Sequence, residues 1–202
     1  MGIPAATKAL QAFTRRDPIV NDREALDALE NELYGTSDRV TAVMLGASVE
    51  TALEKLLASR MRDDLNSDER SKLFGFDGAV GTFSAKIITA YAAKIIGPIT
   101  YSDLNLIKLL RNEFAHSRIP FDFQTPQVVA VCNELQVPKL PDSNNSFPLM
   151  TTRVTSRFGI AGIPPSWMLF VSACHNIAYR MLVKRDGIRE GDFIFVDDEP
   201  LP

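Results

Sequence analysis

The residues best suited to chemistry lie in one short segment, LNLIKLLRNEFAH, between Leu104 and His116. On a helix, which advances about 100° per residue, this segment forms an apolar stripe. The stripe consists of Leu104, Ile107, Leu110 and Phe114. Arg111 projects from the stripe or its margin, where a guanidinium keeps its charge and is costly to bury alone. We therefore expect Arg111 to have a partner: an anion, a cluster of carbonyl groups or a watery cleft.

The residues alone leave two explanations of Arg111 open, and both can hold at once. The first is a structural ion pair, for example with Glu50, which lies at the edge of the apolar stripe of an earlier predicted helix. The second is a cleft in which Arg111, Asn112 and His116 bind an anion such as a phosphate. An arginine fork fits phosphate oxygens, an amide orients the bound group, and an imidazole exchanges protons near neutral pH.

The spacing of Arg111 and His116 limits the second explanation. The two residues are five positions apart, so on a regular helix their side chains point about 140° from each other. They converge only if the arginine side chain sweeps round, if the helix ends near Ala115, or if a second copy supplies the other residue. His116 also suits a simpler role, because a cation near a helix C-terminus interacts favourably with the last carbonyl groups.

A second candidate for anion binding precedes the helix that contains Lys86. The stretch from Phe76 to Thr82 has two glycines and a hydroxyl just before that helix, where free N–H groups can bind an anion, and Lys86 could add charge. The Lys-Ser/Thr ending of a P-loop is absent. The structural alternative is a tight turn with Asp77 or Thr82 as the helix cap, together with a solvated lysine.

The pattern of apolar residues predicts helices and no strands. Helices are expected over about 22–34, 42–61, 80–96 and 102–116, from Pro126 to about 135, and over about 166–185. A polar break covers 62–71, Gly97 and Pro98 end the third helix, and Ser102 or Asp103 caps the fourth.

These elements predict an all-α fold, an antiparallel helical bundle in a single domain over residues 1–202. The core helices span about 22–135. Seven of the twelve prolines fall between Pro120 and Pro165, so the segment from about 136 to 165 is expected to be irregular. The C-terminal helix, about 166–185, is expected to pack on the bundle.

Composition restricts the classes of function. Lys and Arg number 22 against 25 Asp and Glu, a net charge of −3, so direct DNA binding is disfavoured. Cys132 and Cys174 lack the spacing of a metal site or a disulfide framework, and we expect no metal and no cofactor. Cys174 is expected in the core, with His175 beside it on the helix flank. No apolar stretch reaches the length of a membrane span, and the chain start lacks a signal peptide, so we expect a cytoplasmic protein.

Two resemblances bear on function. The run Arg111-Asn112-Glu113-Phe114-Ala115-His116 resembles the Arg-polar-x-x-x-His signature of the HEPN superfamily of helical nucleotide- and RNA-associated domains. The wider stretch from about 74 to 135 is similar to the mannitol operon repressor family of bacterial regulators. In that family a Gly-Thr-Phe-Ser-x-Lys-Ile helix precedes a Leu-x-x-Ile-x-x-x-Arg-Asn-x-Phe-Ala-His helix and a Phe-x-x-Pro helix start, and this sequence carries all three.

The resemblances imply two different functions. Similarity to the mannitol operon repressor family implies a bacterial, cytosolic, non-enzymatic regulator that acts as a helical interaction module through a protein partner, with a homodimer expected. Similarity to the HEPN superfamily implies a metal-independent endoribonuclease or RNA-binding protein. In that case Arg111 stabilises charge on the phosphate, Asn112 orients it, and His116 transfers a proton at the ribose 2′-OH. The predicted ligand-binding residues are Glu50, Lys86, Arg111, Asn112 and His116.

Overall fold

A computed structural model describes residues 37–139 and 163–185 of the chain. Within these ranges the protein is all-α, with six α-helices, one short 3-10 helix and no strands. The predicted fold class is therefore confirmed. Among the described helices, none combines the length and the hydropathy that a membrane span requires. The helix predicted over 22–34 and most of the Pro-rich segment, residues 140–162, lie outside the described residues.

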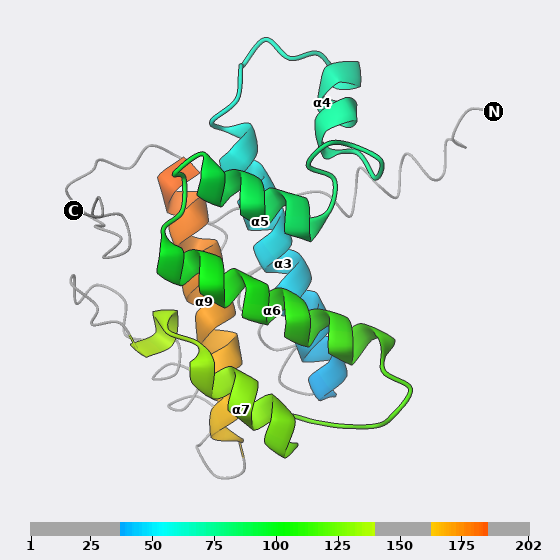
Figure 1. The fold of residues 1–202 in the computed structure, drawn as a ribbon, viewed down its shortest axis with the longest axis vertical. Coiled ribbons are helices and arrows are strands. Elements are labelled where there is room, and N and C mark those ends of the chain that lie inside the picture. The colour runs from blue at the N-terminus through cyan, green and yellow to red at the C-terminus, as the bar shows by residue number, and fades with distance from the viewer. Residues whose placement is uncertain (1–36, 140–162, 186–202) are drawn as a thin grey trace, which may run out of the picture. The chain divides into compact units, whose positions relative to one another are not determined.

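One face of α3 (Asp38–Ala58) is apolar and buried, and the first turn of the helix is capped by the hydroxyl of Ser37, which accepts from the amide of Val40. Its buried apolar residues recur every three or four positions, as an amphipathic helix requires. They are Ala42, Leu45, Val49, Ala52, Leu53, Leu56 and Leu57. α3 packs against α9 (Pro165–Arg185), α6 (Pro98–His116) packs against both, and α5 (Phe83–Ala92) packs against α3 and α6 (Figure 1).

Aromatic rings join α6 to the C-terminal part of the fold. The ring centroids of Phe114 and Phe123 lie 5.0 Å apart, and those of Phe123 and Phe170 lie 5.3 Å apart. All three side chains are fully buried, and such ring pairs stabilise a core beyond their area alone. α7 (Pro126–Glu134) and the 3-10 helix η1 (Val137–Lys139) pack against α9. The helix predicted over 166–185 is thus confirmed, and it lies against the other helices.

The polar break predicted over 62–71 was wrong in its second half, because α4 (Ser67–Phe74) begins within it. No residue of α4 is buried, so no apolar periodicity marks it in the sequence. A capping box starts the helix instead. The Asn66 side chain accepts from the amides of Asp68 and Glu69, and the Glu69 carboxylate accepts from the Asn66 amide.

The bounds of α5 and α6 also differ from the prediction. α5 ends at Ala92, because Lys94 adopts a left-handed backbone conformation with φ of 55°. Gly97 and Pro98 do not end α5 but begin α6, with Pro98 in the first turn, where its missing N–H costs nothing. Asp103 is therefore not a helix cap. It is fully buried, and its carboxylate accepts hydrogen bonds from the backbone amides of Gln136 and Val137.

We expect Lys94→Gly to stabilise the protein by about 1 kcal/mol, because a left-handed residue with a side chain is strained and glycine is not. Lys94 is exposed and follows the last turn of α5, where the Ile95 amide bonds to the Ala90 carbonyl oxygen over 2.9 Å. Urea unfolding followed by circular dichroism measures the change. Lys94→Ala is the control and gives no gain, since alanine keeps the Cβ atom. Equal stability of the Gly and Ala variants would contradict the prediction.

Candidate functional site

Arg111 lies where α6 crosses α3 very closely. A Cβ atom added at Gly46 would lie 2.7 Å from Arg111 Cγ and 2.8 Å from its Cβ. Glycine at this position therefore lets the arginine stem lie against the backbone of α3. One helical turn further along α3 is Glu50, and the guanidinium reaches it. The Arg111 side chain remains 30% exposed, so it sits at the margin of the core, as its place in the sequence predicts.

Glu50 joins two cations from two different helices. One carboxylate oxygen, Oε2, accepts from the Arg111 guanidinium over 3.3 Å, and the other, Oε1, accepts from Lys86 Nζ over 3.0 Å. The Glu50 side chain is only 18% exposed, so both ion pairs are partly shielded from water. The predicted ion pair between Arg111 and Glu50 is thus present in the structure.

Lys86 is the most deeply buried charge of the group, with a side chain 5% exposed. Its ammonium also pairs with Glu54 over 2.8 Å. Burial lowers the pKa of Lys86, but the hydrogen bonds and charges of Glu54 and Glu50 outweigh it and leave the pKa raised. The alternative of a solvated lysine was therefore wrong. The predicted cap at Thr82 is confirmed, because its hydroxyl accepts from the Ala85 amide over 3.1 Å.

Asn112 completes a continuous set of side chains. Its carbonyl oxygen Oδ1 accepts from the other terminal nitrogen of Arg111 over 3.0 Å. The guanidinium is therefore held between a carboxylate and an amide oxygen. We call this set the charge network: Glu54, Lys86, Glu50, Arg111 and Asn112. It contains four of the five predicted ligand-binding residues and spans α3, α5 and α6.

His116 is not part of the charge network. It is the last residue of α6, the helix stays regular up to it, and its side chain is exposed. The predicted divergence of about 140° from Arg111 therefore applies. Among the described residues, no hydrogen bond of the imidazole is found. The structure thus brings Arg111 and Asn112 together and leaves His116 at the exposed end of the same helix.

Two side chains were missed in the sequence: one belongs to the charge network, and the other lies outside it and joins α3 to the end of α6. Glu54 lies one turn after Glu50 on α3 and supplies the second carboxylate to Lys86. Arg39 lies on the first turn of α3 and donates through both terminal nitrogens to the carbonyl oxygen of Ser117, over 3.1 and 3.2 Å. The spacing of Arg39, Gly46 and Glu50 by seven and four residues was the available signal, since it places them on one face of a helix.

Both cysteines of the described residues are buried, and His175 is partly buried. Burial raises the pKa of Cys132 to about 12 and that of Cys174 well above its usual value, so the nucleophilic thiolate is scarce at neutral pH. His175, expected on the helix flank, has a buried Nδ1 that finds no partner in the described part of the chain. Burial lowers the His175 pKa to about 4, which keeps the imidazole neutral at pH 7.

The residues described include no cluster of three His, Cys, Asp or Glu side chains able to hold a metal ion. Comparison of the chain with known protein families, with curated protein sequences and with solved structures finds no match. The charge network is a partly buried, internally paired set of two cations, two carboxylates and one amide.

Proposed function

We propose that this protein is a non-enzymatic regulator that resembles the mannitol operon repressor family and acts through a protein partner. The observation that carries the proposal is the pairing of Arg111 with Glu50 and Asn112. A guanidinium held in this way positions α6 against α3 and has lost much of its capacity to bind a phosphate. The motif residues Arg111 and Asn112 then stabilise the fold, and the outer surface of the helices binds the protein partner.

The charge balance of the network supports this proposal. Two cations, Lys86 and Arg111, face two carboxylates, Glu50 and Glu54. No excess positive charge remains at the network to attract a nucleic-acid backbone, and the whole chain carries a net charge of −3. A regulator of this kind acts on a protein surface rather than by reading a DNA groove. A bacterial, cytoplasmic setting belongs to the same proposal.

The second candidate function is a metal-independent endoribonuclease or RNA-binding protein. It is favoured by one observation: the Arg111 side chain keeps 30% of its surface exposed on the helix that ends with the exposed His116. In such an enzyme His116 would take the proton from the ribose 2′-OH as this oxygen bonds to phosphorus, and Arg111 would stabilise the charge on the phosphate. The bond from phosphorus to the 5′-oxygen would break, and the leaving oxygen would take a proton from water. A second copy would have to supply one of the two residues, since they diverge on a single helix.

Incubation with RNA separates the two candidates. We expect purified protein to leave mixed cellular RNA intact in EDTA, because Arg111 is already paired and His116 is not directed toward it. The measurement is end-group analysis of any fragments, with His116→Ala protein as the control. Fragments with 2′,3′-cyclic phosphates from the wild type alone would overturn the proposal in favour of the ribonuclease. Tight, specific binding of an operator fragment at physiological salt would contradict action through a protein partner.

A further inference from the structure

The most exposed large apolar side chain of the described residues is Phe76, at 95%. It lies in the loop that connects α4 to α5. A single exposed apolar residue is ordinary on a flexible loop. The loop around Phe76, however, is firmly built, so the exposed ring is a fixed feature of this surface.

Backbone hydrogen bonds hold the Phe76 loop in one shape. The amide of Gly78 donates to the Gly75 carbonyl oxygen over 2.8 Å, and the amide of Val80 donates to the Leu73 carbonyl oxygen over 2.8 Å. At three loop positions a Cβ atom would overlap a backbone carbonyl oxygen, and these are Gly75, Gly78 and Gly81. The loop is therefore compact because of its glycines.

The loop and α4 form a protrusion, which we define as residues 62–82. No residue of α4 is buried, and Figure 1 shows α4 set apart from the packed helices. Val80, at the end of the loop, is buried and anchors the protrusion to the core. An ordered segment that contributes so little to the core is free to contact another molecule, and a preorganised aromatic side chain loses little entropy on association.

One face of α4 carries an unpaired anion and an unpaired cation. Asp68 in the first turn and Lys72 in the last turn are four residues apart, so they lie on the same face of the helix. Both residues are exposed, and neither side chain forms a hydrogen bond or an ion pair with any residue that the structure describes. This face is self-complementary, because antiparallel pairing of two α4 helices brings each Asp68 opposite the Lys72 of the other helix.

The same pairing covers the exposed aromatic ring. Phe76 follows the C-terminal end of α4, and in an antiparallel pair that end lies beside the N-terminal end of the second α4. Leu65 precedes α4 at that end and is only half-buried, so it offers an apolar surface to the ring. Contact between Phe76 and Leu65 removes apolar surface from water on both copies.

We propose that two copies of the protein associate through their protrusions, with α4 packed antiparallel against α4 about a two-fold axis. Each Asp68 then forms an ion pair with Lys72 of the second copy, and each Phe76 packs on Leu65 of the second copy. Because α4 is set apart from the packed helices, the two copies meet at their protrusions and their bodies stay clear of each other (Figure 1). This inference concerns self-association and does not rest on the proposed function.

The charges of the protrusion favour a second copy over other occupants. They include both signs, which favours neither a nucleic acid nor an anionic membrane. The exposed charged residues are Arg62, Asp63, Asp64, Asp68, Glu69, Arg70, Lys72 and Asp77. A surface that carries its own counter-charges at related positions is suited to a copy of itself.

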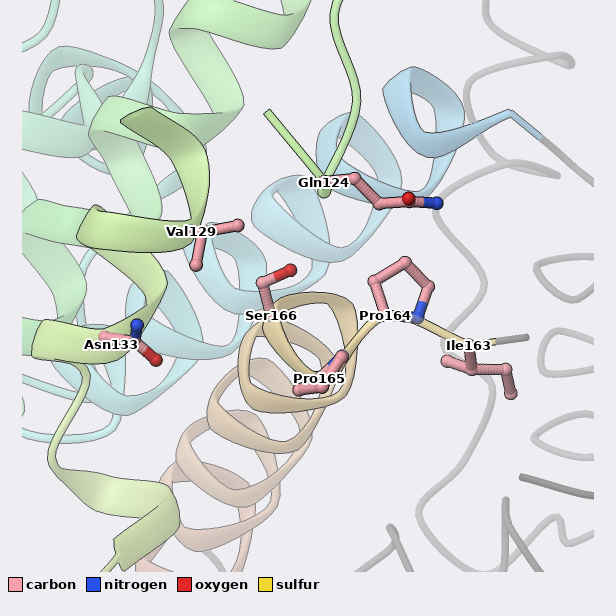
Figure 2. Close-up of a pocket in the computed structure, with 7 residues that line it drawn as sticks. All are labelled: Gln124, Val129, Asn133, Ile163, Pro164, Pro165 and Ser166. Atoms are coloured by element: carbon pink, nitrogen blue, oxygen red, sulfur yellow. The ribbon is translucent and has the colours of Figure 1, made fainter. Parts of the chain in front are cut away.

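An open hollow between α7 and the first turn of α9 is not the receptor for Phe76 (Figure 2). Val129, Pro164 and Pro165 are among the residues that line it. It lies at the other end of the described helices from α4 (Figure 1), so one two-fold axis that joined both sites would make the two copies overlap. Pairing of like surfaces avoids this overlap.

The first test is sedimentation analysis of the full chain over a series of concentrations. One small protrusion from each copy makes a weak contact, so the wild type is expected to dimerise with a roughly micromolar dissociation constant. Phe76→Ser removes both rings and is expected to raise this constant by about 100-fold. Ile119→Ser is the matched control, because Ile119 is 74% exposed and outside the protrusion; it leaves the constant unchanged. Circular dichroism verifies that the variants are folded.

Reversal of single charges makes the test specific to the antiparallel pair. Asp68→Lys leaves two cations on this face of α4 and Lys72→Asp leaves two anions, so each variant alone is expected to associate about 10-fold more weakly than the wild type. An equal mixture of the two variants is expected to recover the lost affinity as a heterodimer, because opposite charges face each other again. Glu134→Lys reverses an exposed charge on α7 and is the control.

Three results would each overturn the inference: a wild type that stays monomeric, an unchanged constant for Phe76→Ser, or a mixture that associates no more tightly than its components. A monomeric wild type would assign Phe76 to a different protein. Unfolding experiments at concentrations below the dissociation constant report on the single chain, so they do not depend on this contact. The RNA experiment above does not involve the protrusion, so each proposal can fail without the other.

Discussion

Lys86→Met is expected to destabilise the protein by about 3–5 kcal/mol, the range for removal of one partner from a buried ion pair. The Lys86 ammonium is the cation for both Glu50 and Glu54, and its side chain is 5% exposed. Methionine fills a similar volume, so the loss is one of charge rather than of packing. Glu54 then lacks its cation, and Glu50 keeps only its ion pair with Arg111. The free energy of unfolding in urea measures the effect.

Two further variants identify the cause of that loss. Lys72→Met changes an exposed lysine on α4 and is expected to alter stability by less than about 0.5 kcal/mol. Lys86→Met combined with Glu54→Gln removes the carboxylate that Lys86 neutralises, whereas Glu50 keeps its ion pair with Arg111, and the double variant is expected to recover part of the stability. A double variant less stable than Lys86→Met would show that Glu54 contributes more to the fold through other contacts than it loses by repulsion.

The difference in stability between wild type and Lys86→Met is expected to depend on pH, because the pKa of Lys86 is raised in the folded protein. A lysine whose pKa is higher in the folded state stabilises the protein fully below its unfolded value of 10.5, and that stabilisation is lost as the pH rises through the folded value. The difference in stability between wild type and Lys86→Met is therefore expected to be constant at neutral pH and to narrow above pH 10.5. A difference that stayed constant through that range would assign the effect to packing.

The sequence was most informative where apolar residues follow the helical period. α3 and α9 bury whole stripes of apolar side chains, and the predicted segments lie within a few residues of the observed helices. α4 could not be found in this way, because none of its residues is buried and its order begins with the side chains of Asn66 and Glu69. A capping box is a local signal that marks the start of a helix even when the helix has no apolar face.

The candidate site was partly predictable for the same reason. Arg111 stands beside a core stripe, so a partner was required, and Glu50 was identified because it borders the stripe of another helix. The burial of Lys86 could not be predicted. It depends on how α5 crosses α3, which the order of residues along one helix does not determine. Helix crossing sets which charges meet, and the sequence sets only which face each charge occupies.

Asp103 is a second charged residue whose contacts could not be predicted from the sequence, and the energetic consequence is large. Its position near the start of a helix suggested a cap, whereas its carboxylate is buried against the end of a different helix. Both oxygens accept from the Gln136 amide over 3.0 Å, and Oδ2 also accepts from the Val137 amide over 2.8 Å. Asp103 thus ties α6 to the segment where α7 ends and η1 begins. A buried acceptor with two backbone donors is difficult to replace.

Asp103→Ala is accordingly expected to cost about 3–5 kcal/mol, since each hydrogen bond to a charged group contributes about 1.5–3 kcal/mol and the Val137 amide is left buried without this acceptor. Asp103→Asn keeps one acceptor oxygen and is expected to lose roughly half as much. Asp122→Ala is the matched control, because Asp122 accepts from the Gln124 amide over 2.9 Å at an exposed position. There water replaces the lost partner, and the cost stays at about 1 kcal/mol or less.

Hydrogen exchange distinguishes the loss of this contact from general unfolding. In Asp103→Asn the amides of Gln136 and Val137 are expected to exchange faster while those in the middle of α3 keep their protection, because the substitution acts where α7 meets η1. Unchanged exchange at Gln136 and Val137 would contradict the role assigned to the carboxylate. Faster exchange throughout α3 as well would mean that Asp103 supports the core as a whole, and that the ends of α6 and α7 cannot separate locally.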